Sequence, residues 1–304
     1  MKNLKTVTLL AESLAVLVTL GFTTGDAAAQ GAPAAASAAE VGRHLSNPTS
    51  DVWALFTEFD YTKNNGTLTG GEDSKTVGFS MIFQPITPIP LTRNWKLLTR
   101  PVIPIIFSTP VPGVDGAGIN FDRKSGLGDI ALPLILAKNH GIKLGKGRLI
   151  GGVGPTFQFP TATNDALGSE TWETGIAGLA VYKTPKWIWI ANPQYWWSTG
   201  KSDDDAPHTS HGSLLYGVFY EAGNAWQVGL SPTITYDAEA SSGNRWNVPI
   251  GLMVAKTTKI GKRMIKFQVA FEYSVVNQDA YGKEFMLRFN VIPVVTSPFS
   301  KPLF

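Results

Sequence analysis

The strongest constraint on the fold is an alternation of apolar and polar residues with a period of two, repeated along most of the chain. The clearest segment has apolar residues at every second position, namely Ile265, Phe267, Val269, Phe271, Tyr273 and Val275. Because successive side chains of a β-strand point to opposite faces, this period predicts strands and not helices. Comparable segments recur about twelve times between residues 52 and 296, an even count that suits a single-chain barrel. We therefore predict an all-β, antiparallel fold.

Three features favour a transmembrane β-barrel over a soluble β-sandwich, which is the open alternative. The segments run to about ten to thirteen residues, the length needed to cross hydrocarbon at a tilt. The expected connections alternate in length, and the long ones span residues 62–74, 107–125, 160–171 and 199–212. Aromatic residues at strand ends would form two interfacial girdles, made of Trp53, Trp95, Trp187 and Trp226 at one end and Tyr61, Trp197, Tyr236 and Tyr273 at the other.

The N-terminus predicts export from the cytoplasm. Two lysines precede an apolar run from Val7 to Phe22, and three alanines at 27–29 provide the small-residue pattern of a cleavage site. We predict a cleaved signal peptide over residues 1–29 and a flexible periplasmic lead-in over 30–51, which is rich in Ala, Pro and Ser. Beyond the signal no apolar stretch reaches about twenty residues, so a barrel is the remaining way for this chain to cross a membrane.

Prolines fall inside the predicted strands, where each removes a donor from the hydrogen-bond ladder. They are Pro101, Pro133, Pro155, Pro193, Pro232, Pro249 and Pro293. Some of these strands must therefore bulge or break.

Charged residues of both signs fall on the polar, inward face of the predicted strands. These candidates for the lumen lining are Lys96, Arg100, Asp129, Glu173, Glu221, Asp237, Lys266, Glu272, Glu284 and Arg288. Such charges can pair across strands, line a water-filled pore, or do both. A structural ladder is an equal alternative for any one of them, and a lumen plugged by the N-terminal segment is a second open possibility.

Enzymatic and metal-binding functions have weaker support. Membrane phospholipases of twelve strands need a His beside a Ser at a strand end. We expect none of the histidines there: His44 falls in the lead-in, His140 in a turn, and His208 and His211 in an external loop. The acidic triplet at 203–205 near these last two histidines could bind a divalent cation, but a solvated loop is the better interpretation. We predict no catalytic residue, metal or cofactor. With a net charge of only +3, the sequence also indicates no nucleic-acid partner.

Three short motifs resemble a known family. They are Ser125-Gly126-Leu127-Gly128-Asp129, Gly154-Pro155-Thr156 followed by Phe159-Pro160-Thr161, and Trp246-Asn247-Val248-Pro249-Ile250-Gly251-Leu252 followed by Gly261-Lys262. Their order is similar to that in the outer-membrane proteins grouped as the MetA-pathway of phenol degradation family. This resemblance implies a barrel in the outer membrane of a Gram-negative bacterium that works as a passive channel for small aromatic or hydrophobic compounds. A structural or lipid-modifying barrel is the alternative.

The C-terminus carries a further indication of outer-membrane assembly. The chain ends in Phe304, as such barrels commonly do for recognition by the barrel assembly machinery. Here Pro298 and Pro302 separate that residue from the last clear strand. We therefore expect residues 297–304 to be a tail, with outer-membrane lipid, the assembly machinery and a small solute as partners of the protein.

Overall fold

A computed structural model describes residues 37–70, 76–115, 118–201, 205–299 and 301–304. The predicted signal peptide and the start of the predicted lead-in lie outside these residues. All of the described residues belong to one compact unit, 31–304. None of the helices in the described part of the chain is long and apolar enough to cross a membrane.

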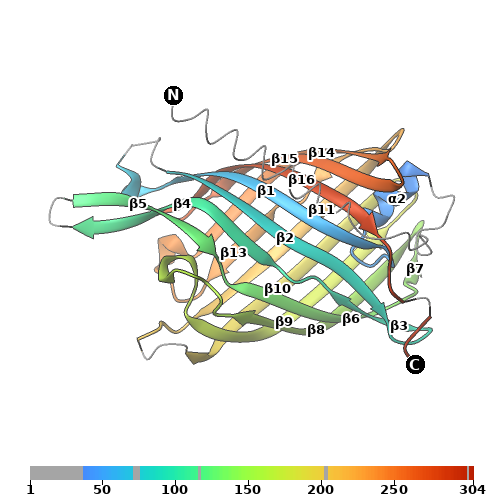
Figure 1. Ribbon diagram of the computed structural model, residues 1–304, viewed down its shortest axis with the longest axis horizontal. Coiled ribbons are helices and arrows are strands. Elements are labelled where there is room, and N and C mark those ends of the chain that lie inside the picture. Colours follow the sequence, from blue (N-terminus) through green and yellow to red (C-terminus); the bar gives the residue numbers. More distant parts are fainter. Residues whose placement is uncertain (1–36, 71–75, 116–117, 202–204, 300) are drawn as a thin grey trace. The chain divides into compact units, whose positions relative to one another are not determined.

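The described strands form a closed antiparallel barrel (Figure 1). Strand β1 (Trp53–Asn65) pairs along one edge with β2 (Val77–Pro90) and along the other with β16 (Gly282–Val295), so the first and last strands join. Closure satisfies the backbone groups of both edges, which a membrane requires. The prediction of a transmembrane antiparallel barrel of about twelve strands is confirmed.

Twelve crossings make up the described barrel, nine continuous and three built from two shorter strands. The other continuous crossings are β8 (Gly147–Phe159), β9 (Thr171–Lys183), β10 (Trp187–Lys201), β11 (Ser210–Gly223), β14 (Trp246–Ile260) and β15 (Arg263–Val276). The composite crossings are β3 (Trp95–Thr99) with β4 (Ile103–Asp115), β5 (Gly118–Leu127) with β6 (Ile130–Lys138), and β12 (Trp226–Leu230) with β13 (Thr233–Asp237). A short strand, β7 (Ile142–Leu144), pairs with β8.

Two prolines stand where crossings break. Pro101 lies between β3 and β4, and Pro232 lies between β12 and β13. Pro249 stays in β14, but the register of β14 against β15 shifts between Val248 and Pro249. The expectation that some proline-containing strands bulge or break is therefore confirmed, since proline removes a donor from the ladder. Pro155, Pro193 and Pro293 nevertheless stay in register with the neighbouring strands.

The sequence-based prediction is wrong for one of the four long connections. Residues 107–125 are not a loop, because β4 and β5 pair in a long hairpin whose register reaches from Ile105↔Leu127 to Asp115↔Gly118. Figure 1 shows this hairpin extending past the neighbouring strands at one end of the barrel. The connections 66–76, 160–170 and 202–209 are long, as predicted. They contain the single-turn 3₁₀ helices η1 (Thr67–Thr69) and η3 (Asp165–Leu167), and η4 (Ser242–Asn244) lies between β13 and β14.

The prediction of a flexible lead-in over 30–51 is wrong for its second half. Residues Ala38–Leu45 form an α-helix, α2, whose N-terminal cap is the Ser37 hydroxyl accepting from the Glu40 N–H at 3.2 Å. Val41 and Leu45, one helical turn apart, are buried against Ile292 of β16. A composition poor in apolar residues still supplies one apolar face, and the inside of the barrel supplies the surface that stabilises it.

The C-terminal tail turns back along the end of the barrel. The N–H groups of Leu303 and Phe304 donate to the carbonyls of Pro90 and Leu91, at 3.0 and 2.9 Å, and the Phe304 side chain is exposed. The tail therefore contacts the β2–β3 turn and does not prolong β16. Recognition of Phe304 by an assembly machinery stays a prediction.

Large apolar side chains cover the outside of the barrel. Outward residues such as Ile176, Leu252, Val269, Phe271 and Leu287 are exposed to between 44% and 59%. In a soluble protein so extensive an apolar surface would be buried against a partner, whereas on a membrane barrel it faces lipid. Exposed tryptophans on the same face begin several strands, namely Trp95, Trp187, Trp226 and Trp246, and exposed Trp197 lies in the second half of β10.

Candidate functional site

A cavity of about 720 Å³ occupies the barrel lumen. Much of its wall is apolar, including Phe56, Leu98, Ile135, Leu179, Ile190 and Phe219. These residues come from six different strands, so the apolar wall is a property of the closed barrel and not of one segment. A volume of this size can hold a small organic molecule.

The apolar character of this wall was not predicted from the sequence. In β9, Ala177, Leu179 and Val181 point inward and are buried, while Ile176 on the opposite face is 54% exposed. Both faces of this half-strand are apolar, so alternation gives no signal there. The same holds for Phe56 of β1, which departs from the alternation of its strand and lines the cavity.

A buried ionic cluster borders the cavity. The Nε of Arg288 lies 2.9 Å from Asp60 Oδ1 and 3.1 Å from Glu58 Oε1, and its Nη1 lies 3.3 Å from Glu272 Oε1. Each of the four side chains is at most 12% exposed. In such surroundings the attraction between charges is stronger than in water, and an unpaired charge is correspondingly costly.

The register predicted for Glu272 and Arg288 is confirmed. Arg288 is the Cα partner of Ala270, two residues from Glu272, so the pair is a diagonal cross-strand contact on the inner face. Leu287, the next residue, is 44% exposed on the outer face. Arg100 joins this region from the break between β3 and β4, and its guanidinium lies 5.0 Å from the centre of the Phe56 ring.

Three other predicted lumen residues hold the N-terminal segment inside the barrel. The Lys96 ammonium donates to the Thr49 carbonyl at 2.7 Å and to Asp51 Oδ1 at 2.6 Å. The Lys266 ammonium donates to the Ser46 hydroxyl. Glu221 lies 3.8 Å from the Arg43 guanidinium of α2. These charges therefore stabilise a segment inside the lumen, and Lys266 also lines the lumen cavity.

Helix α2 is anchored to the barrel wall by further polar contacts. Ser46, just after the helix, donates to Gln227 Oε1 at 2.8 Å, and Gln227 in turn donates to Glu221 at 2.6 Å. Arg43 donates from Nη2 to the Thr184 carbonyl at 2.7 Å, and from Nη1 to the Pro185 carbonyl. These partners are far apart in sequence, so the barrel must close before α2 has a binding surface.

His211 does not lie in a loop, which corrects the sequence-based prediction. It is the second residue of β11, and its ring stacks on Trp196 with centroids 5.2 Å apart. Its Nε2 lies 2.8 Å from Oε2 of the predicted lumen residue Glu173, whose side chain is fully buried. Among the described residues Glu173 is the only side chain hydrogen-bonded to this ring.

Asp129 stands at the break between β5 and β6 and anchors the loop that follows β8. Its carboxylate accepts from the N–H groups of Ala162 at 3.0 Å and Ser169 at 2.6 Å. The same loop covers the break, because the Thr163 hydroxyl accepts from the Leu127 N–H. A side chain at Gly126, where φ is +151°, would collide with that hydroxyl.

A second cavity, of about 500 Å³, lies at this break. It shares Pro104, Asp129 and Gln158 with the lumen cavity, so these three side chains separate the two spaces. Asp129 thus lines the lumen but is held mainly by a loop.

Two predicted residues stand at strand ends. Asp237 lines the cavity and also caps the turn after β13, accepting from the Glu239 N–H at 2.9 Å. Glu284 requires a correction: β16 bulges there, since Lys63 pairs with Phe285 and Asn64 with Lys283. The bulge places Lys283 in the cavity wall and leaves Glu284 with the Asn65 amide as its partner, at 3.1 Å.

Among the described residues no group of three or more His, Asp or Glu side chains could hold a metal ion. Two members of the acidic triplet, residues 203 and 204, lie outside the described part of the chain.

Comparisons with known proteins agree with the barrel geometry. The COG4313 outer membrane channel from Pseudomonas putida F1 has a similar structure, with a TM-score of 0.58 and 15% identity over 81% of this chain and 96% of that one. Outer membrane phospholipase A from Escherichia coli, as an active-site mutant, gives a TM-score of 0.44 with 12% identity over 85% of this chain and 99% of that one. The CymD monoaromatic hydrocarbon channel gives 0.35 with 9% identity over 83% and 92%.

The first of these similarities shows the barrel fold, and the other two are too low to carry an argument. No curated protein matches the sequence. The family model described as the MetA-pathway of phenol degradation matches residues 41–289, which is most of the chain. The chain therefore belongs to the MetA-pathway of phenol degradation family.

Proposed function

We propose that this protein is a passive outer-membrane channel for small aromatic or hydrophobic compounds. The observation that carries the proposal is the lumen cavity of about 720 Å³, whose wall combines apolar side chains with a buried ionic cluster. An apolar wall favours an apolar solute, and a few polar groups at its border orient the solute or admit water. The family description points to the same class of compound.

The proposal includes a location and a set of partners. The exposed apolar belt fits the hydrocarbon of an outer membrane, with lipid as the outer partner. We place the protein in a Gram-negative outer membrane, reached through a signal peptide over residues 1–29 and the barrel assembly machinery. A net charge of +3 supports no nucleic-acid partner.

We assign no catalytic role to the lumen. His211 and Glu173 form a hydrogen-bonded pair, which a hydrolase would also contain. In the described structure the ring of His211 stacks on Trp196 and contacts no hydroxyl nucleophile. A phospholipid-hydrolysis assay with the purified barrel is therefore expected to release no fatty acid.

Two neighbouring residues on opposite faces of β6 allow a matched test of the channel. Ile135 lines the lumen and is 6% exposed, whereas Leu136 faces outward and is 41% exposed. Ile135→Trp should fill part of the cavity and slow uptake of a small aromatic solute into proteoliposomes. Leu136→Trp adds the same bulk on the lipid face and should leave uptake unchanged. Equal uptake by both variants and the native protein would contradict a route through this cavity.

A further inference from the structure

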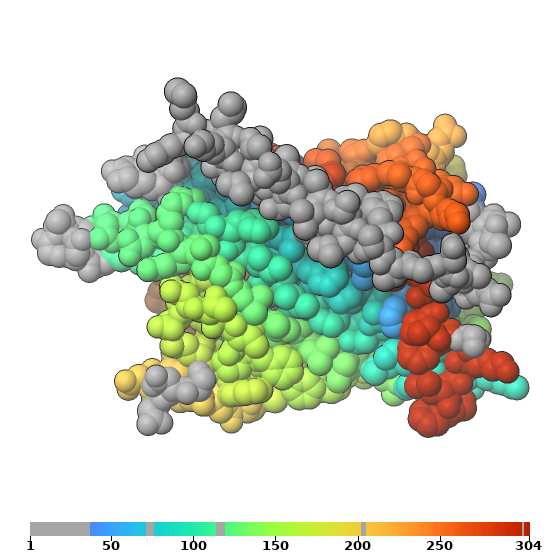
Figure 2. All heavy atoms as spheres, viewed as in Figure 1, coloured from blue at the N-terminus to red at the C-terminus, as the bar shows by residue number. Residues whose placement is uncertain are grey.

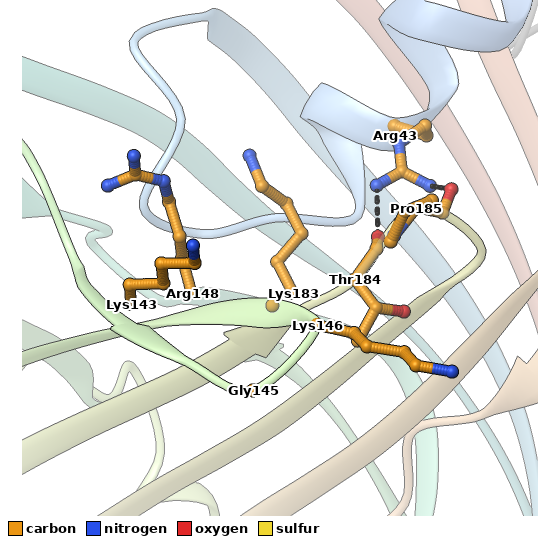
Figure 3. Close-up of a pocket in the computed structure, with 9 residues that line it drawn as sticks. Arg43, Lys143, Gly145, Lys146, Arg148, Lys183, Thr184 and Pro185 are labelled. Atoms are coloured by element: carbon orange, nitrogen blue, oxygen red, sulfur yellow. Dashed lines mark hydrogen bonds between the residues drawn. The ribbon is translucent and has the colours of Figure 1, made fainter.

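A cluster of positive charge lies away from the lumen cavity, at the end of the barrel that carries the short turns. It surrounds a cavity of about 520 Å³. The lining comes from α2, from the β7–β8 hairpin, and from the end of β9 with the turn that follows it (Figure 3). Five of the nine lining residues are cations, Arg43, Lys143, Lys146, Arg148 and Lys183, and no described acidic residue lines the cavity.

Three of these cations form a row across neighbouring strands. Lys143 of β7 is the Cα partner of Arg148 of β8, and Arg148 is the Cα partner of Lys183 of β9. Figure 3 shows their side chains rising from the same side of the sheet, while Lys146 extends in another direction. Like charges directly opposite each other on adjacent strands destabilise a sheet. The three cations of this row therefore repel one another, and a bound anion would reduce that repulsion.

The protein supplies little compensating charge here. Within the described residues, Lys143, Arg148 and Lys183 form no ion pair, and Arg148 donates only to the carbonyl of Gly141, at 3.2 Å. Asp51 is paired with Lys96, at 2.6 Å. Arg43 is paired with Glu221, at 3.8 Å.

The backbone fixes this arrangement. The β7–β8 turn consists of Gly145 and Lys146, and Gly145 has a φ of +54°, a conformation suited to glycine. A side chain at Gly147 would collide with the Lys183 carbonyl. The hairpin is thereby held tightly against β9, which keeps the three cations in line.

We propose that this cluster is a binding site for a phosphate group, carried either by free phosphate or by the headgroup of an anionic lipid. Guanidinium and ammonium groups are the usual protein partners of phosphate oxygens. Arg43 belongs to α2 whereas the other cations belong to the barrel wall, so a bound phosphate connects the helix to the wall. Occupation of the site then holds α2 in the lumen. The importance of this for solute passage rests on the proposed function as a channel.

The test measures binding directly, without reference to transport. Inorganic phosphate is titrated by calorimetry into the full-length barrel in detergent, and thermal stability is compared in nanodiscs of phosphatidylcholine with and without phosphatidylglycerol. The variant Lys143→Gln with Lys183→Gln removes two charges but keeps a polar side chain, one atom shorter than lysine, at each position. The control, Lys259→Ala with Lys262→Ala, removes two exposed charges at the same end of the barrel, one from the end of β14 and one from the β14–β15 turn.

We expect the double glutamine variant to weaken binding by about tenfold or more, and the control variant to bind like the native protein. Phosphate binding in detergent would identify the free anion as the ligand, and stabilisation by phosphatidylglycerol alone would identify the lipid headgroup. An equal loss in both double variants, or no response to either probe, would overturn the proposal. Heat-dependent gel mobility checks that each variant is folded, so these results stand whether or not the barrel conducts solute.

Discussion

Arg288 and Asp60 are Cα partners across the seam between the last and first strands, and their side chains form an ion pair of 2.9 Å. The contact joins residues more than two hundred positions apart at the point where the barrel closes. Because Glu58 and Glu272 contact the same guanidinium, Arg288 joins three buried carboxylates. The cluster thus contributes to closure of the barrel and to the charge of its lumen.

Loss of the Arg288 charge should affect both the closure of the barrel and the charge of its lumen. Arg288→Met leaves three carboxylates around an apolar side chain, and we expect it to cost about 3 kcal/mol of stability, as removal of one partner of a buried ion pair does. The surplus negative charge should shift reversal potentials toward cation selectivity. Thermal unfolding and planar-bilayer recordings measure the two effects. Adding Asp60→Asn should recover part of both, and no recovery would show that the ion cluster is not the cause.

Leu287 tests the outward face of the same strand. Because this side chain faces lipid, Leu287→Arg should cost about 2–4 kcal/mol if the residue lies near the bilayer midplane. The fraction of protein that assembles into lipid vesicles measures the loss. Leu287→Phe preserves the apolar surface and is expected to assemble normally. Efficient insertion of the arginine variant would place Leu287 away from hydrocarbon.

Lys266 should control the docking of α2. Lys266→Met removes the hydrogen bond to Ser46, and a hydrogen bond to a charged group stabilises by roughly 1.5–3 kcal/mol, so the helix should leave the lumen more often. Single-channel recordings should then show longer open times. Lys256→Met is the control, because Lys256 lies over the exposed Trp226 ring and does not contact α2. Identical recordings from the two variants would argue against α2 as a plug.

Acid should loosen the same helix through His44. Burial, followed by the charge of Lys183, lowers the pKa of His44 below its ordinary value of 6.5. Arg43 acts in the same direction, whereas Glu40 and Asp51 oppose it. The docked helix therefore favours the neutral ring, so docking is most stable above about pH 6.5 and weakens as the pH falls through the lowered pKa.

A spin label at Ala39→Cys reports this change as an increase in mobility at low pH. His44→Asn cannot take up the proton and should remove the pH dependence. If the pH dependence persists in that variant, another group is responsible.

An alternation of period two depends only on residues that are close in sequence. The strands that it predicts are present in the structure, because each strand needs only one apolar face toward lipid. The diagonal contact of Glu272 with Arg288 was predictable for the same reason, since two long strands joined by a short loop have few possible registers. Where both faces are apolar, as around Leu179, or where a bulge intervenes, as at Glu284, local pattern carries no such information.

The ordered structure of residues 38–51 depends on contacts with residues that are distant in sequence. The predicted lead-in 30–51 as a whole is rich in Ala, Pro and Ser, so a flexible segment was the reasonable prediction. Lys96 and Lys266, which bind Thr49 and Ser46, come from distant strands. The basic row of Lys143, Arg148 and Lys183 likewise exists only across three paired strands. Such sites depend on closure of the barrel, because closure is what brings their members within the few ångströms over which hydrogen bonds and ion pairs act.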